Sequence, residues 1–268
     1  MSGFSSAWLA LREPLDLAAR DQAVEAAFMQ RVPSAAPRML DLASGAGSTV
    51  AALKNQLPED TSWLLTDYDH GLLEVATSRW STSGSGDLAT LGIDLASDVE
   101  ALPFSEVDAI STSAFLDLVS EPFLQRLVNC VVEAGKPFLA SLSYDGRIGF
   151  EPASVLDATM RDALNHDQLS DKGFGKALGP GAAARAIDLF RCAGYQVVQG
   201  PSDWEIGPSN TGFLAEFLSG WSRVGVKYGA SGEQVEAWRS GHLDQAGAGR
   251  FRCTVGHIDF AAFPGQGS

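Results

Sequence analysis

Cysteine is scarce in this sequence of 268 residues: only Cys130, Cys192 and Cys253 occur, and they stand far apart. An odd number of cysteines without a Cys-x-x-Cys spacing predicts neither a disulfide framework nor a zinc site, and we expect no bound metal. The same scarcity favours a reducing compartment, so we expect a cytoplasmic protein.

Long apolar runs are missing as well. The sequence has no stretch of about 18 apolar residues, so it predicts no membrane span. Its first residues, MSGFSSAWLALREPLDL, lack the basic start and the apolar stretch of a signal peptide. We therefore expect no association with a membrane.

Basic residues are few, because 19 Lys and Arg stand against 33 Asp and Glu and give a formal net charge of -14. Affinity for nucleic acids depends largely on Lys and Arg that replace counterions along the phosphate backbone. The basic residues are also spread thinly along the chain. A nucleic-acid partner is therefore disfavoured and a small-molecule substrate is favoured, while the oligomeric state is not indicated.

What the sequence does contain is an alternation of strand-like and helix-like segments. Apolar residues at helical spacing predict a helix over 14–31, and we expect residues 1–35 to form an N-terminal helical segment. The alternation that follows predicts βαβ crossovers, hence a doubly wound α/β fold with a mainly parallel sheet covered on both faces. The predicted strands are 38–43, 62–67, 88–94, 107–112, 137–143, 195–198 and 251–262.

The second half of the chain departs from this regular alternation. After the strand at 137–143 we expect a helical or lid insertion around 151–180, whose glycine-rich end permits movement. Extra helices are predicted around 211–246. All these parts are expected to belong to one domain, residues 36–268.

The stretch LDLASGAGS at 40–48 joins an acid at a strand end to a turn of small residues. Glycine permits positive φ and removes the Cβ that would block a ligand, and the following helix offers free N–H groups. A dinucleotide asks for G-x-G-x-x-G, but Val50 stands at the third position after Gly45 and Gly47. S-adenosylmethionine asks for small residues at alternate positions after an acid. Here the acid is Asp41, placed to hold the guest's amino group directly or through water.

Two further acids follow the next two strands. Asp67, about 20 residues after the turn, is placed to accept both ribose hydroxyls of an adenosine, with Asp69 as a substitute. The carboxylate of Asp94 can accept from the adenine amino group while the N–H of Leu95 donates to a ring nitrogen. The alternative for Asp67 is an ordinary strand-end or helix-cap acid, and the alternative for Asp94 is a loop aspartate. Three acids at three successive strand ends favour the adenosine site.

Taken together, these segments resemble a class I S-adenosylmethionine-dependent methyltransferase. LDLASGAGS is similar to the first motif of that family, TDYDHGLLEVA to the second, GIDLAS to the third and VDAISTSAFLDLVS to the fourth. The resemblance covers about residues 36–145. Ala43 and Ser44 depart from the commonest glycine-rich form but remain small. LREPLD, DKGFGKALGP and VGHIDF resemble bacterial methyltransferase-like proteins.

The resemblance implies a Rossmann-like, seven-stranded sheet in which the last strand, 251–262, is antiparallel. It also implies S-adenosyl-L-methionine as the cofactor and S-adenosyl-L-homocysteine as the product. The cofactor-binding residues that it implies are Asp41, Ala43, Ser44, Gly45, Gly47, Asp67, Tyr68, Asp94, Leu95 and Ser111.

Methyl transfer from a sulfonium is an in-line displacement that needs alignment and, for some acceptors, removal of a proton. The fourth motif, Ser111 to Asp117, lacks the N/D-P-P-Y/F signature associated with nucleic-acid bases and glutamine. His166, in the polar stretch NHDQLSDKGFG, is the favoured base, with a solvated loop histidine as the alternative. Tyr144 and Asp145 are further catalytic candidates, unless YDGR is a plain turn.

Four residues are predicted to bind the acceptor. Arg147 is placed to bind a carboxylate or phosphate, Lys172 to anchor an anion, and Asp117 and Phe174 complete the set. We therefore expect methyl transfer to O, N or C of a small molecule. Two alternatives stay open: binding of S-adenosylmethionine or S-adenosylhomocysteine without catalysis, and an NAD-dependent oxidoreductase. Val50 and the missing Tyr-x-x-x-Lys pair disfavour the second.

Overall fold

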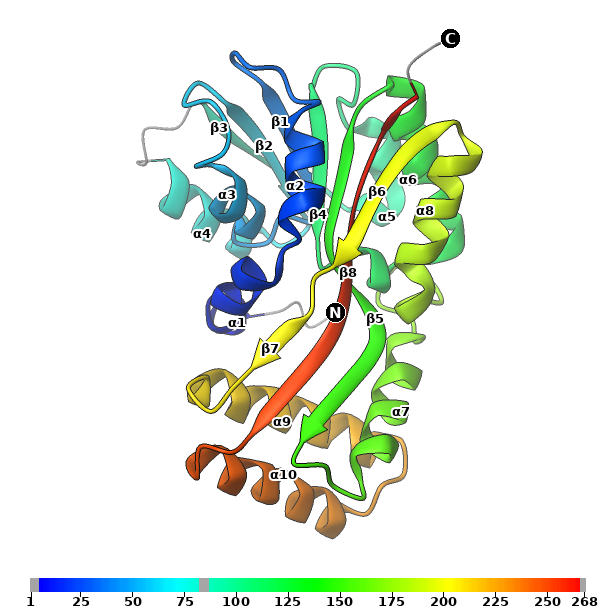
Figure 1. Cartoon of the computed structure of the whole chain (residues 1–268). Coiled ribbons are helices and arrows are strands. Elements are labelled where there is room, and N and C mark those ends of the chain that lie inside the picture. The colour runs from blue at the N-terminus through cyan, green and yellow to red at the C-terminus, as the bar shows by residue number, and fades with distance from the viewer. Residues whose placement is uncertain (1–4, 82–86, 266–268) are drawn as a thin grey trace.

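Eight strands form one sheet in the computed structural model, which describes residues 5–81 and 87–265. The order across the sheet is β3-β2-β1-β4-β5-β8-β6, with β7 paired to β8 beside this path (Figure 1). The strands are β1 (Arg38–Leu42), β2 (Ser62–Asp67), β3 (Leu88–Gly92), β4 (Ala109–Ser113), β5 (Phe138–Glu151), β6 (Tyr195–Pro201), β7 (Trp204–Ile206) and β8 (Arg252–Pro264).

The directions of the strands confirm the predicted α/β fold. β1 to β5 run parallel, and β8 is antiparallel to both β5 and β6. The strand order reverses between β1 and β4, where sheets of this type bind ligands beyond their carboxyl ends. The sheet has one strand more than the predicted seven, because the three residues of β7 pair with the first part of β8.

Helices cover both faces of the sheet and bury an apolar core on each. One face carries α6 (Glu121–Ala134) and α8 (Ala182–Cys192), and the other carries α2 (Gln22–Met29), α3 (Ser48–Leu53) and α4 (His70–Trp80). Short turns of helix follow β3 and β4, namely α5 (Leu95–Asp98), η1 (Val99–Ala101) and η2 (Leu116–Leu118). Among the helices of the described ranges, not one is long and apolar enough to cross a bilayer.

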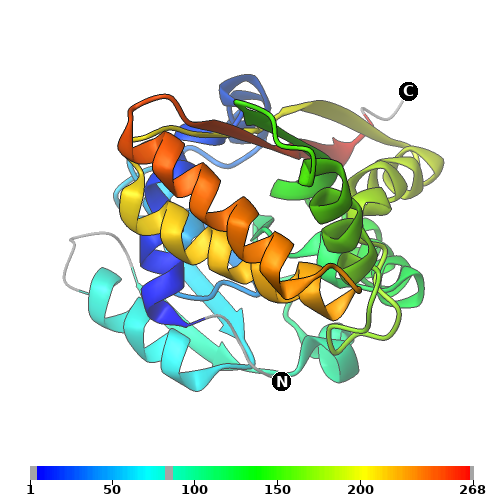
Figure 2. The same cartoon turned by 90° about the horizontal axis from the view of Figure 1, so that it is seen from below.

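The strands β5 and β8 continue past the others as a long ribbon. After two irregularities, their pairing runs from Ile148–Val255 to Glu151–Arg252, so the strand predicted at 137–143 extends to Glu151. The helices α7 (Asp157–Gln168), α9 (Thr211–Lys227) and α10 (Gly232–Gly247) pack on this ribbon around a third core, and Figure 2 shows α9 and α10 side by side. The 3-10 turn η3 (Gly179–Gly181) leads from this part into α8.

The N-terminal segment forms two helices, so the single helix expected over 14–31 is wrong. Helix α1 (Ser6–Ala19) contains Pro14, and α2 begins after Asp21. The carboxylate of Asp21 accepts from the N–H groups of Ala23 and Val24, and such a cap starts a new helix. Because the helix breaks here, α1 does not continue along α2. It packs instead against β7, α9 and α3.

Candidate functional site

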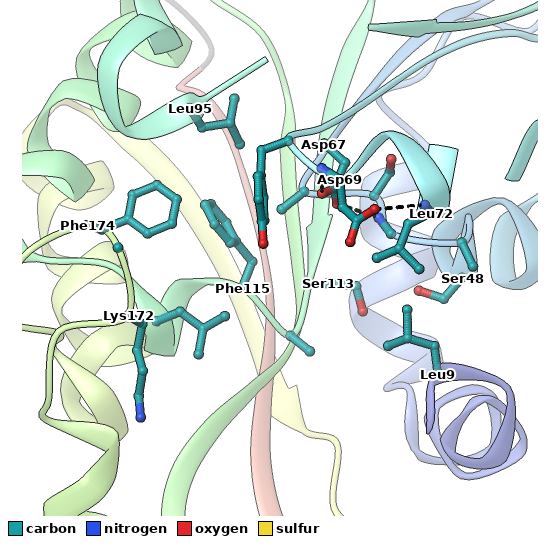
Figure 3. A pocket seen from close by; sticks show the side chains of 18 of the residues that line it. Leu9, Ser48, Asp67, Asp69, Leu72, Leu95, Ser113, Phe115, Lys172 and Phe174 are labelled. Atoms are coloured by element: carbon teal, nitrogen blue, oxygen red, sulfur yellow. Dashed lines mark hydrogen bonds between the residues drawn. The ribbon is translucent and has the colours of Figure 1, made fainter. Parts of the chain in front are cut away.

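A cavity of about 480 Å³ opens beyond the carboxyl ends of β1 to β4, at the reversal of strand order. Its size lies within the roughly 300–1,000 Å³ of small-molecule sites. Figure 3 shows side chains from both halves of the sheet around it. The lining comprises Leu9, Arg12, Glu13, Asp16, Ala43–Ala46, Ser48, Asp67–Asp69, Leu72, Ile93–Leu95, Ser113–Phe115, Leu118 and Asp171–Phe174.

The turn between β1 and α3 forms one wall of the cavity. Ala43, Gly45 and Gly47 all have positive φ, of 50°, 52° and 82°. Ala43 adopts this left-handed conformation although it has a Cβ, so the departure from glycine at that position leaves the bend intact. A Cβ on Gly47 would lie 2.5 Å from Nε1 of Trp80, so this glycine permits close packing of the turn on α4.

Asp67 joins the end of β2 to this turn. Its Oδ2 accepts from the N–H of Gly45 at 2.9 Å, and its Oδ1 accepts from the N–H of Asp69 at 2.9 Å. The side chain lines the cavity and is 8% exposed, and burial raises its pKa. Each oxygen keeps a lone pair that a ligand hydroxyl can use.

The other predicted adenosine contacts also line the cavity. Asp94 caps α5 by accepting from the N–H of Ala96 at 3.0 Å, and Asp69 caps α4 through Gly71 and Leu72. Both acids therefore cap helices, so Asp94 is not a plain loop aspartate, and each also faces the cavity. Leu95 is buried beside Asp94, and Tyr68 is 48% exposed.

Asp41 and Ser111 lie behind the cavity wall rather than in it. The Ser111 hydroxyl donates to Oδ1 of Asp41 at 2.7 Å, while Oδ2 has no partner among the described residues. Desolvation raises the pKa of Asp41 to about 7. Contact of Asp41 with a ligand stays a prediction, as does that of Ser111.

The three predicted catalytic residues lie away from the cavity lining. His166 belongs to α7 rather than to a loop, and its ring contacts Tyr228. The Tyr144 hydroxyl is turned to Asn165, to which it donates at 2.6 Å, and burial raises its pKa. Asp145 accepts from Arg147 on the ribbon.

The predicted acceptor residues divide into two groups. Lys172 and Phe174 line the cavity, with Phe174 packed edge-on against Phe115 and Phe123. Asp117 is buried beside the lining residue Leu118 and does not line the cavity itself. Its Oδ1 has no partner within the described chain, and desolvation raises the pKa of its carboxyl to about 6.

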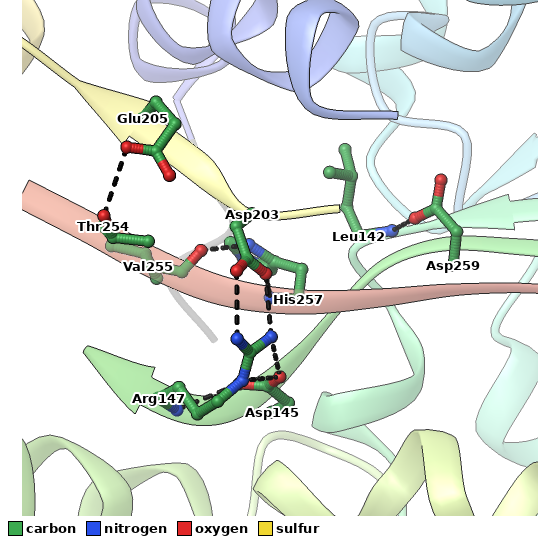
Figure 4. Close-up of polar contacts among 9 residues, drawn as sticks. All are labelled: Leu142, Asp145, Arg147, Asp203, Glu205, Thr254, Val255, His257 and Asp259. Carbon is green, nitrogen blue, oxygen red and sulfur yellow. Dashed lines mark hydrogen bonds and ion pairs between the residues drawn. The ribbon is translucent and has the colours of Figure 1, made fainter. Parts of the chain in front are cut away.

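Arg147 is the remaining acceptor residue, and it lies outside the cavity. It forms two hydrogen bonds with Asp203, at 2.8 and 3.0 Å, and one with Asp145 (Figure 4). Its guanidinium therefore ties β5 to the segment before β7 and already pairs with the carboxylates of Asp145 and Asp203.

Sequence reasoning missed the contribution of α1, which supplies Leu9, Arg12, Glu13 and Asp16 to the lining. Leu9 reaches the turn, because a Cβ on Gly45 would lie 3.3 Å from its Cδ1. The resemblance begins near residue 36, so no motif covers α1. The only sequence signal for this contribution is the helical spacing of the charged residues Arg12, Glu13 and Asp16.

Comparison with family models found no match, and comparison with the sequences of curated proteins found none either. Solved structures do match. A cyclopropane-fatty-acyl-phospholipid synthase-like protein from Lactobacillus casei superposes with a TM-score of 0.56 at 12% identity, over 98% of this chain and 96% of that one. YcgJ from Bacillus subtilis gives 0.52 at 17% identity, over 91% and 99%.

A candidate methyltransferase from Bacillus halodurans also gives a TM-score of 0.52, at 14% identity and over 90% and 98% of the two chains. At such identities the likeness concerns the fold. The chain therefore has the Rossmann-like fold of the class I S-adenosylmethionine-dependent methyltransferases.

Proposed function

We propose that this protein transfers a methyl group from S-adenosylmethionine to a small-molecule acceptor and releases S-adenosylhomocysteine. The observation that carries the proposal is the position of Asp67. Its carboxylate lies at the end of β2, within a hydrogen bond of the Gly45 N–H, so one cavity contains a hydroxyl-accepting acid and a bare main-chain turn.

The lining fits each part of such a cofactor. Asp67 would accept the ribose hydroxyls, and Asp94 with the N–H of Leu95 would receive the adenine edge while Ile93 and Leu95 cover its face. The turn at Ala43–Gly47 leaves room for the amino-acid tail. Acidic groups outnumber basic ones in the lining, which suits a guest with a cationic sulfonium.

When bound, the sulfonium supplies an activated methyl group, so the chain's own task is to align an acceptor and exclude water. Phe115, Leu118 and Phe174 form an apolar wall beyond β4 that serves this purpose. The dinucleotide alternative is disfavoured, because Val50, at the third position of the glycine motif, is fully buried in the core under α3.

Calorimetric titration with S-adenosylhomocysteine and with NAD tests the proposal. We expect micromolar binding of the first and none of the second. Asp67→Ala should weaken S-adenosylhomocysteine by about 1–3 kcal/mol, because buried donors lose their acceptor. The matched control is Asp162→Ala, an exposed acid on α7 that should leave the affinity unchanged. Equal affinity of the Asp67→Ala variant and the wild type would reject the assignment.

A protein that binds the cofactor without catalysis is a second candidate. The observation in its favour is that His166, Tyr144 and Asp145 all lie outside the cavity lining. Incubation of metabolite extracts with isotopically labelled methyl donor separates the two. A labelled product supports transfer, whereas tight binding of S-adenosylhomocysteine with no labelled product across broad extracts selects the binding protein.

A further inference from the structure

Two basic side chains line the part of the cavity that lies beyond β4. Arg12 comes from α1 and Lys172 from the loop after α7. Both act electrostatically on the buried carboxyl of Asp117, which lies in the short helix η2 after β4. The adenosine contacts Asp67 and Asp94 stand at the ends of β2 and β3, on the other side of the reversal in strand order.

The guanidinium of Arg12 is held in one orientation from two sides. Its Nε donates to Oδ2 of Asp16 at 2.8 Å, and Oδ1 of Asp16 in turn accepts from Nε1 of Trp204 at 3.0 Å. The guanidinium carbon also lies 5.5 Å from the centre of the Trp204 ring. Because the side chain is only 11% exposed, few other orientations are open to it.

Two nitrogens of this guanidinium remain available. Within the described part of the chain, Nε is the only side-chain nitrogen of Arg12 that donates to a residue, so Nη1 and Nη2 have no acceptor. Two of the neighbouring acids are engaged: Glu13 pairs with Arg79 at 2.7 Å, and both oxygens of Asp16 are in use. The buried Asp117 keeps an Oδ1 without a partner among the described residues. The free edge of a guanidinium matches the two oxygens of a carboxylate.

We propose that Nη1 and Nη2 of Arg12 bind a carboxylate of the methyl acceptor. Lys172, whose Nζ pairs with Asp167 at 2.7 Å, adds a second basic side chain to the lining. The inference rests on the proposed function, which assigns the β2 and β3 side to adenosine. Phe115, Leu118 and Phe174 make the adjoining wall apolar. The acceptor class is therefore a small carboxylic acid with an apolar body. The other source of the same chemistry is the amino-acid carboxylate of the methyl donor.

The test uses benzoate and hexanoate as probes, each paired with its amide, on protein saturated with S-adenosylhomocysteine. Ligand-observed NMR should detect the acids and not the amides. Arg12→Gln should weaken the acids roughly 10- to 100-fold, because a charge-assisted pair is lost. Arg12→Lys, which keeps the charge but not the fork, should fall between. Lys176→Gln, a change outside the lining, is the control and should leave binding unchanged.

A second titration separates the two carboxylate sources. If Arg12→Gln weakens S-adenosylhomocysteine but not 5′-methylthioadenosine, which has no carboxylate, Arg12 serves the donor and the proposal is overturned. Equal binding of acid and amide, or no binding of either acid, overturns it as well. Retained S-adenosylhomocysteine affinity shows that a variant is folded. Failure of the wild type to bind S-adenosylhomocysteine instead overturns the proposed function, and the acceptor role with it.

Discussion

Two aspartates near the ends of the neighbouring strands β1 and β2, Asp41 and Asp67, have different environments. Asp67 faces the cavity and accepts from two main-chain N–H groups, whereas Asp41 is sealed behind the turn with a single hydroxyl donor on Oδ1. Desolvation raises the pKa of both carboxyls, and that of Asp41 reaches about 7. Asp41 pairs in register with Leu65, two residues before Asp67. Its carboxyl lies in the core, whereas that of Asp67 faces the cavity, where contact with a ligand stays a prediction.

The raised pKa of Asp41 predicts a pH dependence of stability. Between its unfolded value of 3.8 and its folded value of about 7, the folded chain keeps a proton that the unfolded chain has lost. The free energy of unfolding therefore falls as pH rises through this window and levels off above it. Asp41→Asn should remove this fall. Between about pH 4 and pH 8 the free energy of unfolding of the variant should therefore rise, relative to that of the wild type, by about 2–4 kcal/mol.

Urea unfolding of wild type and variant at both ends of that window measures the effect. Asp162→Asn provides the control, because its carboxyl is on the surface and its loss should leave the pH slope as it was. Parallel slopes for Asp41→Asn and the wild type would mean that the carboxyl is ionised in the folded protein.

At the scale of elements, the turn between β1 and α3 depends on Gly47 for two separable reasons. Its φ of 82° strains any other residue, and a Cβ would meet Trp80 of α4 at 2.5 Å. Gly194 offers a matched comparison, because its φ is 83° but no atom lies within 4 Å of its would-be Cβ.

We expect Gly47→Ala to cost about 1–3 kcal/mol more than Gly194→Ala, because only the first forces α4 to move. Denaturant unfolding of both variants gives the two losses directly. Similar losses would show that backbone strain alone governs the turn, and that packing on Trp80 contributes nothing.

The sequence predicted the parts of the site that sit next to strand ends, because each such residue follows a recognisable apolar run. Asp67, Asp94 and Gly45 line one cavity, and Gly47 belongs to the same turn without lining it, while their contact with a ligand stays a prediction. The contribution of α1 was not predictable in this way. Its position depends on the break at Asp21 and on packing of Trp8 against Phe213, contacts between segments far apart in the chain.

The extension of β5 was missed for a related reason. SYDGR reads locally as a turn, but β8 supplies strand partners as far as Glu151, and one of the two register shifts, between Tyr144 and Ile148, takes up Gly146. Tyr144 and Asp145 therefore lie on the β5–β8 ribbon, and neither of these predicted catalytic residues lines the cavity. The length of β5 depends on its pairing with β8, which is distant in the sequence, and a local sequence pattern carries no information on such pairing.

Across the whole molecule, residues 5–81 and 87–265 form three apolar cores, two on the faces of the sheet and one beneath the β5–β8 ribbon. The cavity lies where the core under α6 and α8 meets the core beneath the β5–β8 ribbon. Its walls come from strand ends, from α1 and from the loop after α7. The acidic surface, with a net charge of -14, accompanies an acid-rich lining.

The central claim is that adenosine binds across the ends of β1, β2 and β3. A crystal structure with S-adenosylhomocysteine tests it most directly. The account predicts both ribose hydroxyls within hydrogen-bond distance of Asp67 and the adenine edge beside Asp94 and Leu95, with the tail under the turn. A nucleoside bound elsewhere, or a ribose whose hydroxyls avoid Asp67, would contradict it.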